Sequence, residues 1–181
     1  MNVAQAILLC RLAQRFPLPL PESASPQARE LSRGGDDPRG VSMHEAGHAL
    51  LAWRLGWPFR SVSIGRAGDG NIGRVDLQWP SDKAARPLVE IEEMAIRSAG
   101  PIATHLYRGN SGLDWDRGHK DYFIMREGRL LDRPANDLLR AEAIARRELA
   151  VNWRAVCALA DALLDAGVLG GERACEILAW S

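Results

Sequence analysis

The spacing of apolar residues in the first third of the chain predicts two helices separated by an irregular stretch. Residues 2–15 have helical spacing, and a second helix is expected from the N-cap Asp37 to about Leu55. Gly56, directly after Leu55, is typical of a helix end. Four prolines and a glycine pair within residues 17–36 predict a linker or an ordered surface loop between the two helices.

Two short runs with strand-like alternation follow the second predicted helix. In the first run Val62 and Ile64 share one face, and in the second run Val75, Leu77 and Trp79 alternate with polar residues. The residues between the runs are rich in glycine and predict a turn. Together the two runs predict a β-hairpin or two strands of a small sheet.

The second half of the chain has helical spacing almost throughout. Its first helix is expected over residues 88–107, where Gly100 and Pro101 should kink or split it. Residues 115–127 are a further candidate helix. From residue 134 to about residue 166 the spacing is strongly helical, with an expected break near Asn152, and a last short helix follows three glycines.

These elements predict a mostly α fold with a small β-hairpin or sheet. The 181 residues suffice for one domain, and 46% hydrophobic with 25% charged residues is an ordinary globular balance. We expect an N-terminal helix and linker over residues 1–36 and one domain over residues 37–181.

Charge and cysteine content narrow the range of partners and compartments. The 23 basic and 23 acidic residues cancel, so no nucleic-acid or anionic-membrane surface is indicated. Three cysteines (Cys10, Cys157 and Cys175) form no CxxC pair, which favours a reducing compartment. No apolar run approaches the roughly 20 residues that span a bilayer. We therefore expect a soluble, cytoplasmic protein without a membrane segment.

The residues His44-Glu45-Ala46-Gly47-His48 carry the chemistry of the chain. Histidines four residues apart share one helical face, so both imidazoles can reach one zinc ion, which accepts imidazole nitrogen. Glu45 lies about 100° around the helix from His44, where it suits the role of general base toward a metal-activated water better than that of a ligand. The motif predicts a zinc hydrolase.

Two structural readings compete with this chemical one. In the first, the histidines are ordinary surface or core residues. In the second, Ser42 and Glu45 form a capping box that begins the helix. The expected start at Asp37 argues against the box because it places Ser42 inside the helix. Gly47 costs about 1 kcal/mol in a helix interior compared with alanine. Its presence suggests that another backbone or a substrate approaches there.

The segment from Val41 to Gly56 resembles the zinc helix of the FtsH-type metallopeptidases. Weaker similarities follow in the order of that family, over roughly residues 38–180: they are Ser61–Ile64 for the next strand, Ala99–Ala103 for an AGRAAEE-like helix, Ser111–Asp116 for a G-A-x-x-D segment and Leu159–Glu172 for the C-terminal helices. The resemblance implies an FtsH-peptidase-like helical fold, a Zn²⁺ cofactor and peptide hydrolysis. It also implies that Asp116 is the third metal ligand, beside His44 and His48.

The chain departs from that family in two respects. Thr104 and His105 stand where the AGRAAEE-like helix has paired acids. The membrane segments and the ATPase module of the family have no counterpart, and no G-x-x-x-x-G-K-[ST] phosphate loop is present. The expected substrates are therefore unstructured peptides or proteins that another agent has unfolded.

Spacing alone leaves the third ligand open. The downstream groups that can complete the site are Glu90, Glu92, Glu93, His105, Asp114, Asp116, His119 and Asp121. Glu92 and Glu93 fit a helix-borne glutamate ligand, and Asp114 is the nearest competitor of Asp116. His119 would share a helical face with Asp116, so it is a candidate transition-state donor or extra ligand, but the sequence favours a plain surface histidine.

The expected function is zinc-dependent hydrolysis of peptide bonds, independent of ATP. The alternatives are a non-catalytic or regulatory binding domain with the same fold, or a peptidase that depends on a separate ATPase partner. A homo-oligomer is compatible with the sequence. Glu45 discriminates between the first two functions, because a binding domain has no need of a general base.

Overall fold

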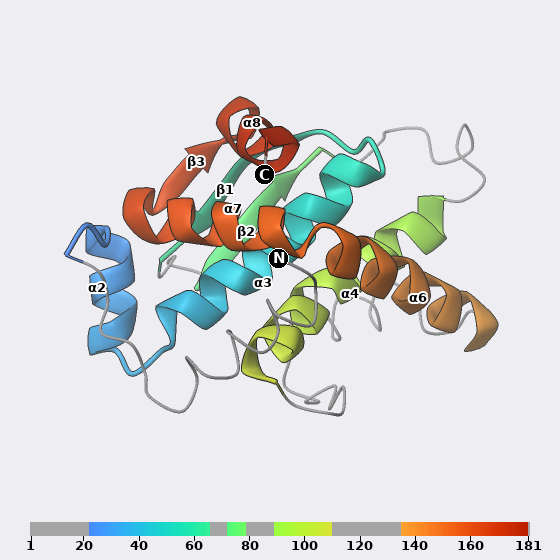
Figure 1. Ribbon diagram of the computed structural model, residues 1–181, viewed down its shortest axis with the longest axis horizontal. Coiled ribbons are helices and arrows are strands. Elements are labelled where there is room, and N and C mark those ends of the chain that lie inside the picture. Colours follow the sequence, from blue (N-terminus) through green and yellow to red (C-terminus); the bar gives the residue numbers. More distant parts are fainter. Residues whose placement is uncertain (1–21, 66–71, 79–88, 110–134, 181) are drawn as a thin grey trace.

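The computed structural model describes residues 22–65, 72–78, 89–109 and 135–180, and Figure 1 shows their arrangement. The described elements are α2 (Pro26–Arg33), α3 (Pro38–Arg54), β1 (Phe59–Ile64), β2 (Gly73–Leu77), α4 (Val89–Arg108), α6 (Ala135–Val151), α7 (Trp153–Ala166), β3 (Val168–Gly170) and α8 (Gly171–Trp180). Helices with one small antiparallel sheet confirm the mostly α expectation. No helix among these residues combines the length and apolar character needed to cross a membrane.

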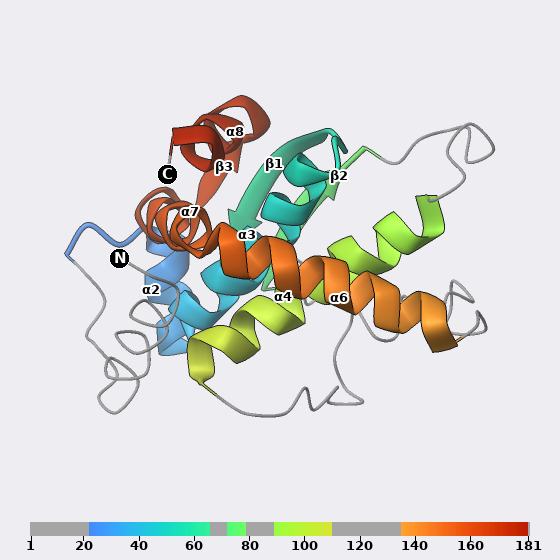
Figure 2. The same ribbon diagram turned by 45° about the vertical axis from the view of Figure 1, so that its right-hand side comes forward.

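Helix α3 lies at the centre of the molecule. It packs against α4, α7 and the sheet, as the two views in Figures 1 and 2 show. Small residues allow this close packing, because Ala46, Gly47, Ala49 and Ala52 are all buried along α3. The helix with the two histidines of the motif is thus held on several sides at once.

The expected limits of α3 are confirmed. Asp37 occupies the N-cap position, although its carboxylate makes no capping hydrogen bond and instead pairs with Arg108 at 3.8 Å. Gly56 follows the last turn with a φ of 73°, a left-handed conformation that favours glycine. Ser42 lies inside the helix and donates to the Pro38 carbonyl at 2.9 Å, so the capping-box reading is wrong.

The predicted hairpin is confirmed as β1 and β2, which pair antiparallel with Val62 opposite Val75. Trp79 lies outside the described residues. The sheet has the order β2-β1-β3, so β1 also pairs with β3, where Val62 faces Leu169. The pattern of the chain did not predict β3, because three residues between two helices carry too little alternation to be recognised.

Helix α4 is continuous from Val89 to Arg108, and the alternative that Gly100 and Pro101 split it is wrong. Proline removes one backbone hydrogen bond from a helix interior. Here the residues around it are buried, with Ile96, Ala99 and Ile102 at most 1% exposed. Packing against α3 and α6 therefore holds the helix together across Pro101.

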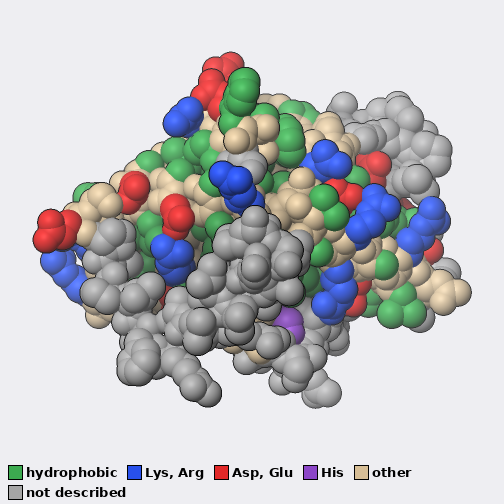
Figure 3. All heavy atoms as spheres, in the orientation of Figure 1, with side chains coloured by type: hydrophobic (Ala, Val, Ile, Leu, Met, Phe, Trp, Pro, Cys, Tyr) green, Lys and Arg blue, Asp and Glu red, His purple; other side chains and the backbone are tan. Residues whose placement is uncertain are grey.

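The helical tail breaks as expected at Asn152, between α6 and α7. Helix α6 is amphipathic: Ala141, Ala145 and Leu149 are buried, whereas its arginines are on the outer face. Figure 3 shows basic side chains over this part of the molecule. The final helix α8 is also as expected, and residues 2–15 and 115–127 lie outside the described residues.

Helix α2 corrects the expectation of an irregular stretch over residues 17–36. The Ser25 hydroxyl accepts a hydrogen bond from the Ala28 amide at 3.2 Å, and Pro26 begins the helix. Ala28 and Leu31 are fully buried in the same core as α3. The division of the chain at residue 36 stays a prediction.

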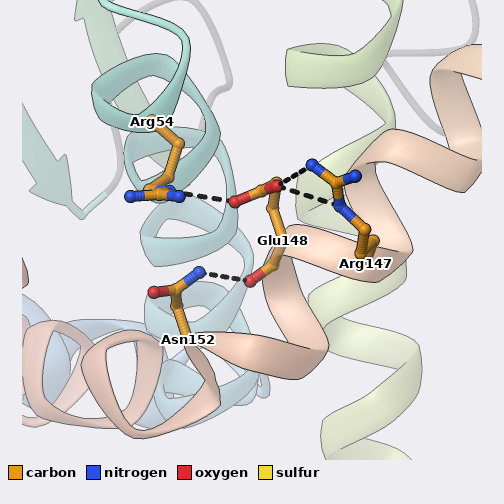
Figure 4. A network of polar contacts seen from close by, with 4 residues as sticks. All are labelled: Arg54, Arg147, Glu148 and Asn152. Carbon is orange, nitrogen blue, oxygen red and sulfur yellow. Dashed lines mark hydrogen bonds and ion pairs between the residues drawn. The ribbon is translucent and has the colours of Figure 1, made fainter.

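A polar network joins α3 to α6 (Figure 4). Glu148 of α6 is 8% exposed and accepts hydrogen bonds from Arg147 at 2.7 Å and from Arg54, in the last turn of α3, at 2.9 Å. The Asn152 side chain donates to the Glu148 carbonyl at 2.8 Å. The bond from Arg147, together with the interactions with Arg54, lowers the pKa of the Glu148 carboxyl against the opposing effect of burial.

Candidate metal centre

The two histidines of α3 bring their Nε2 atoms together. His44 Nε2 lies 3.0 Å from His48 Nε2, and the two rings are nearly perpendicular, at 83°. This follows from the helix, because residues four apart are stacked on one face. The face points at α4, which supplies the partners of both rings.

The Nδ1 atoms of both rings face hydrogen-bond partners on α4. His48 Nδ1 lies 2.7 Å from the Ile96 carbonyl oxygen, which can only accept, so this nitrogen carries a proton. His44 Nδ1 lies 3.2 Å from the Thr104 hydroxyl, which donates its own proton to the Gly100 carbonyl at 3.1 Å. While that bond is made, the hydroxyl has only lone pairs to offer to His44. In the neutral form of each ring, Nε2 then presents a lone pair.

This arrangement fits a metal ion. Two lone pairs 3.0 Å apart repel each other, so either a proton or a metal ion lies between the two Nε2 atoms. Two nitrogens bound to one zinc at about 2.0–2.1 Å in tetrahedral geometry are separated by about 3.4 Å. The separation in the protein is within a few tenths of an ångström of that value. The pattern of an Nδ1 proton donated to a carbonyl or side-chain oxygen is also the usual one for metal-binding histidines.

Gly100 leaves room at the point where the two Nε2 atoms converge. A Cβ at this position would lie 2.3 Å from His48 Nε2 and 2.7 Å from His44 Nε2. Any larger residue would therefore occupy the place that a shared ion requires. This glycine forms part of the candidate site through its lack of a side chain.

Gly47 has a different role, in the contact between α3 and α4. A Cβ there would lie 2.7 Å from both the Ala99 carbonyl oxygen and the Ala103 Cβ. The approach of another backbone, which the mid-helix glycine suggested, is thus confirmed. The close contact brings the acceptors of α4 within reach of the histidines.

Glu45 lies beside the histidine pair and faces β2. It is 7% exposed, and a Cβ on Gly73, the first residue of β2, would lie 2.5 Å from its Oε1 atom. The part of the chain that the structure describes contains no group of three His, Cys, Asp or Glu residues arranged to hold a metal. The role of Glu45 as general base stays a prediction.

The proposed third ligand Asp116 lies outside the described residues, as do Asp114, His119 and Asp121. Among the other candidates, Glu92 accepts from the Trp57 indole at 2.7 Å, and Glu93 accepts from Arg97 through two bonds of 3.0 and 2.9 Å. Neither they nor Glu90 or His105 join the histidines in a three-residue group within the described ranges.

His105 belongs to a different environment from the histidine pair. The pKa of His105 is lowered mainly by burial and, to a smaller extent, by the positive charge of Arg146 on α6. A neutral ring is therefore favoured at this position.

Sequence reasoning missed the α4 side of the centre. Ile96, Gly100 and Thr104 recur every four residues and share one helical face. That spacing was readable, but nothing local to α4 says that this face meets the histidines.

Comparison with models of known protein families finds no match for this chain, and no curated protein matches it. The chemical interpretation therefore depends on the histidine pair, the groups that orient it and the adjacent carboxylate.

Proposed function

We propose that this protein is a zinc-dependent peptidase with an FtsH-peptidase-like fold, in which His44 and His48 bind the metal and Glu45 is the general base. The observation that carries the proposal is the pair of Nε2 atoms 3.0 Å apart, each in a ring whose Nδ1 atom lies within hydrogen-bond distance of an oxygen on α4. A proton between the two Nε2 atoms would also account for their approach, so the zinc measurement described below decides between a proton and a metal ion.

The chain's own residues would divide the reaction between them. Zinc, when bound, supplies a Lewis acid and lowers the pKa of a coordinated water to about 7. The Ile96 carbonyl accepts the proton of His48 Nδ1 and so leaves Nε2 of that ring to the metal, and the Thr104 hydroxyl contacts Nδ1 of His44. Glu45 accepts a proton from the attacking water and passes it to the leaving amine nitrogen. Its burial excludes most competing solvent from the carboxylate.

The third ligand in this proposal is Asp116, as the resemblance to the FtsH-type peptidases implies. Two histidines leave zinc one protein group short of the three that catalytic sites usually supply. We expect Asp116→Asn to weaken zinc binding at least about tenfold and Asp114→Asn to weaken it less, as measured by competition with a fluorescent chelator. The reverse order would transfer the role to Asp114.

The sheet suggests how a substrate would bind. Strand β2 lies at an edge of the described three-stranded sheet, and its first residue, Gly73, contacts Glu45. An extended peptide that pairs with this edge strand would run past the Glu45 carboxylate, with its peptide bonds accessible to the attacking water. This supports unstructured peptides or unfolded proteins as substrates, since a folded chain cannot add a strand.

The decisive experiment is a comparison of zinc content and digestion of unfolded casein, with and without chelator. Glu45→Gln should keep the fold and the zinc but lose hydrolysis, because the amide has the same shape and cannot accept the proton. His44→Ala with His48→Ala should lose the zinc. Glu30→Gln, on the exposed surface of α2, is the matched control and should resemble the parent protein.

Two results would contradict the proposal. Turnover by Glu45→Gln within a few-fold of the parent would remove its role as base. Stoichiometric zinc in the double histidine variant would place the metal elsewhere. Zinc binding without any hydrolysis would favour the alternative of a binding domain, and hydrolysis that requires an added ATPase would favour the partner-dependent peptidase.

A further inference from the structure

The two histidines are oriented by groups of different kinds. His48 donates to a backbone carbonyl, that of Ile96, which a side-chain substitution cannot remove. His44 donates to a side chain, Thr104, at the longer distance of 3.2 Å. The Nδ1 partner of His44 is therefore a side chain, which a substitution can replace.

We propose that Thr104 is a positioning residue that selects the Nδ1–H tautomer of His44 and thereby makes its Nε2 available to the metal. The inference rests on the proposed function as far as it concerns zinc. Its first part, the choice of tautomer, concerns the metal-free protein. There the bond of Thr104 to the Gly100 carbonyl competes with a hydrogen bond between the two Nε2 atoms, 3.0 Å apart, and the tautomer of His44 reports which of them prevails.

The direction of the hydrogen bonds follows from the single proton of the hydroxyl. Thr104 Oγ1 donates to the Gly100 carbonyl one helical turn earlier, at 3.1 Å, which also restricts the rotamer of the threonine. Only the lone pairs of Oγ1 remain for His44. The hydroxyl thus accepts from Nδ1–H and cannot donate to an unprotonated Nδ1 without giving up its bond to Gly100.

The Thr104 hydroxyl stands where a carboxylate often orients a metal-binding histidine. A carboxylate adds negative charge to the imidazole as well as orientation, whereas a hydroxyl adds orientation alone. The contribution of Thr104 to zinc affinity should therefore be lost when its hydroxyl is removed and kept when only its methyl group is removed.

Thr104→Val and Thr104→Ser separate these two features. Valine keeps the β-branched shape and lacks the acceptor, and serine keeps the acceptor. We expect Thr104→Val to weaken zinc binding by about 10–100-fold, the range typical of groups that orient a ligand, and Thr104→Ser to stay within about threefold of the parent. Competition with a fluorescent chelator on the full chain measures both.

A second measurement addresses orientation directly. Long-range ¹H–¹⁵N NMR of the metal-free protein, at a pH where imidazole is neutral, identifies the tautomer of each histidine. The parent protein and Thr104→Ser should show Nδ1–H at His44, and Thr104→Val should shift His44 toward Nε2–H. His48 is the internal control, because its partner is the unchanged carbonyl of Ile96.

The outcomes distinguish this inference from the proposed function. Equal zinc affinity in parent and Thr104→Val, an unchanged His44 tautomer, or a serine variant as weak as the valine variant would overturn the role of Thr104. A parent protein that binds no zinc would overturn the proposed function, while the tautomer measurement would still decide the role of Thr104. Thr104→Ala replaces Thr104→Val if the latter does not fold.

Discussion

Replacing Gly100 with alanine is a direct test of where the metal would lie. The added Cβ would come within 2.3 Å of His48 Nε2 and 2.7 Å of His44 Nε2, whereas ordinary contact begins at 3.4 Å. The imidazoles would have to move by roughly 1 Å, because atoms at such distances repel steeply. Metal sites hold ligand distances within about 0.2 Å, so the two nitrogens could no longer share one ion. We expect zinc affinity to fall by more than about 100-fold.

The same substitution should leave the protein folded. Alanine is favoured over glycine in a helix interior by about 1 kcal/mol, whereas forcing a methyl group into a packed site costs about 1–3 kcal/mol. The clash is with side-chain rings, which can rotate, rather than with backbone. The net change in the free energy of unfolding should therefore remain within about 2 kcal/mol.

The assay combines zinc titration against a competing chelator with thermal unfolding of the metal-free protein followed by circular dichroism. Gly170→Ala is the matched control, since a Cβ at Gly170 would meet nothing within 4 Å. It should bind zinc like the parent. Unchanged zinc affinity in a folded Gly100→Ala protein would refute the placement of the ion between the two Nε2 atoms.

Three further predictions follow from the same contacts. Gly73→Ala should abolish hydrolysis and leave zinc content unchanged, because its Cβ would lie 2.5 Å from Glu45 Oε1 and displace the base; activity near that of the parent protein would contradict this. Gly47→Ala should lower the free energy of unfolding in urea by about 1–3 kcal/mol, because the clash includes an α4 backbone oxygen that cannot rotate away; equal stability would show that the helices separate freely. Glu148→Gln should cost about 1–2 kcal/mol at neutral pH. Because Arg147 and its neighbours lower the pKa of Glu148, its contribution is present above the ordinary value of 4.5 and is lost as the pH falls through the lowered value. The variant and the parent should therefore converge in stability in acid, and a constant difference down to acid pH would contradict the assignment.

Local signals in the sequence were sufficient to predict the elements that have clear end signals or a regular pattern of apolar residues. The limits of α3, the β1–β2 hairpin and the break at Asn152 all follow from caps, alternation or helix breakers that act within a few residues. The same is true of the histidine pair, because spacing of four on any helix puts two side chains on one face. Asp116 stays a prediction from resemblance.

Other features depended on contacts between distant parts of the chain. Helix α2 forms among prolines because Ala28 and Leu31 reach the core, and β3 exists as a strand because β1 pairs with it. Helix α4 continues through Pro101 because buried neighbours hold both of its halves. In each case tertiary packing outweighs the local preference of the residues.

The candidate site divides in the same way. The sequence alone determined which side chains of α3 can bind a metal and which can act as a base, since that requires only their chemistry and the period of a helix. The tertiary structure decided which groups face each ring, because the Nδ1 partners of His44 and His48 lie 60 and 48 residues away along the chain. It also decided where an ion has room, because the absence of a side chain at Gly100 matters only once α4 lies against α3.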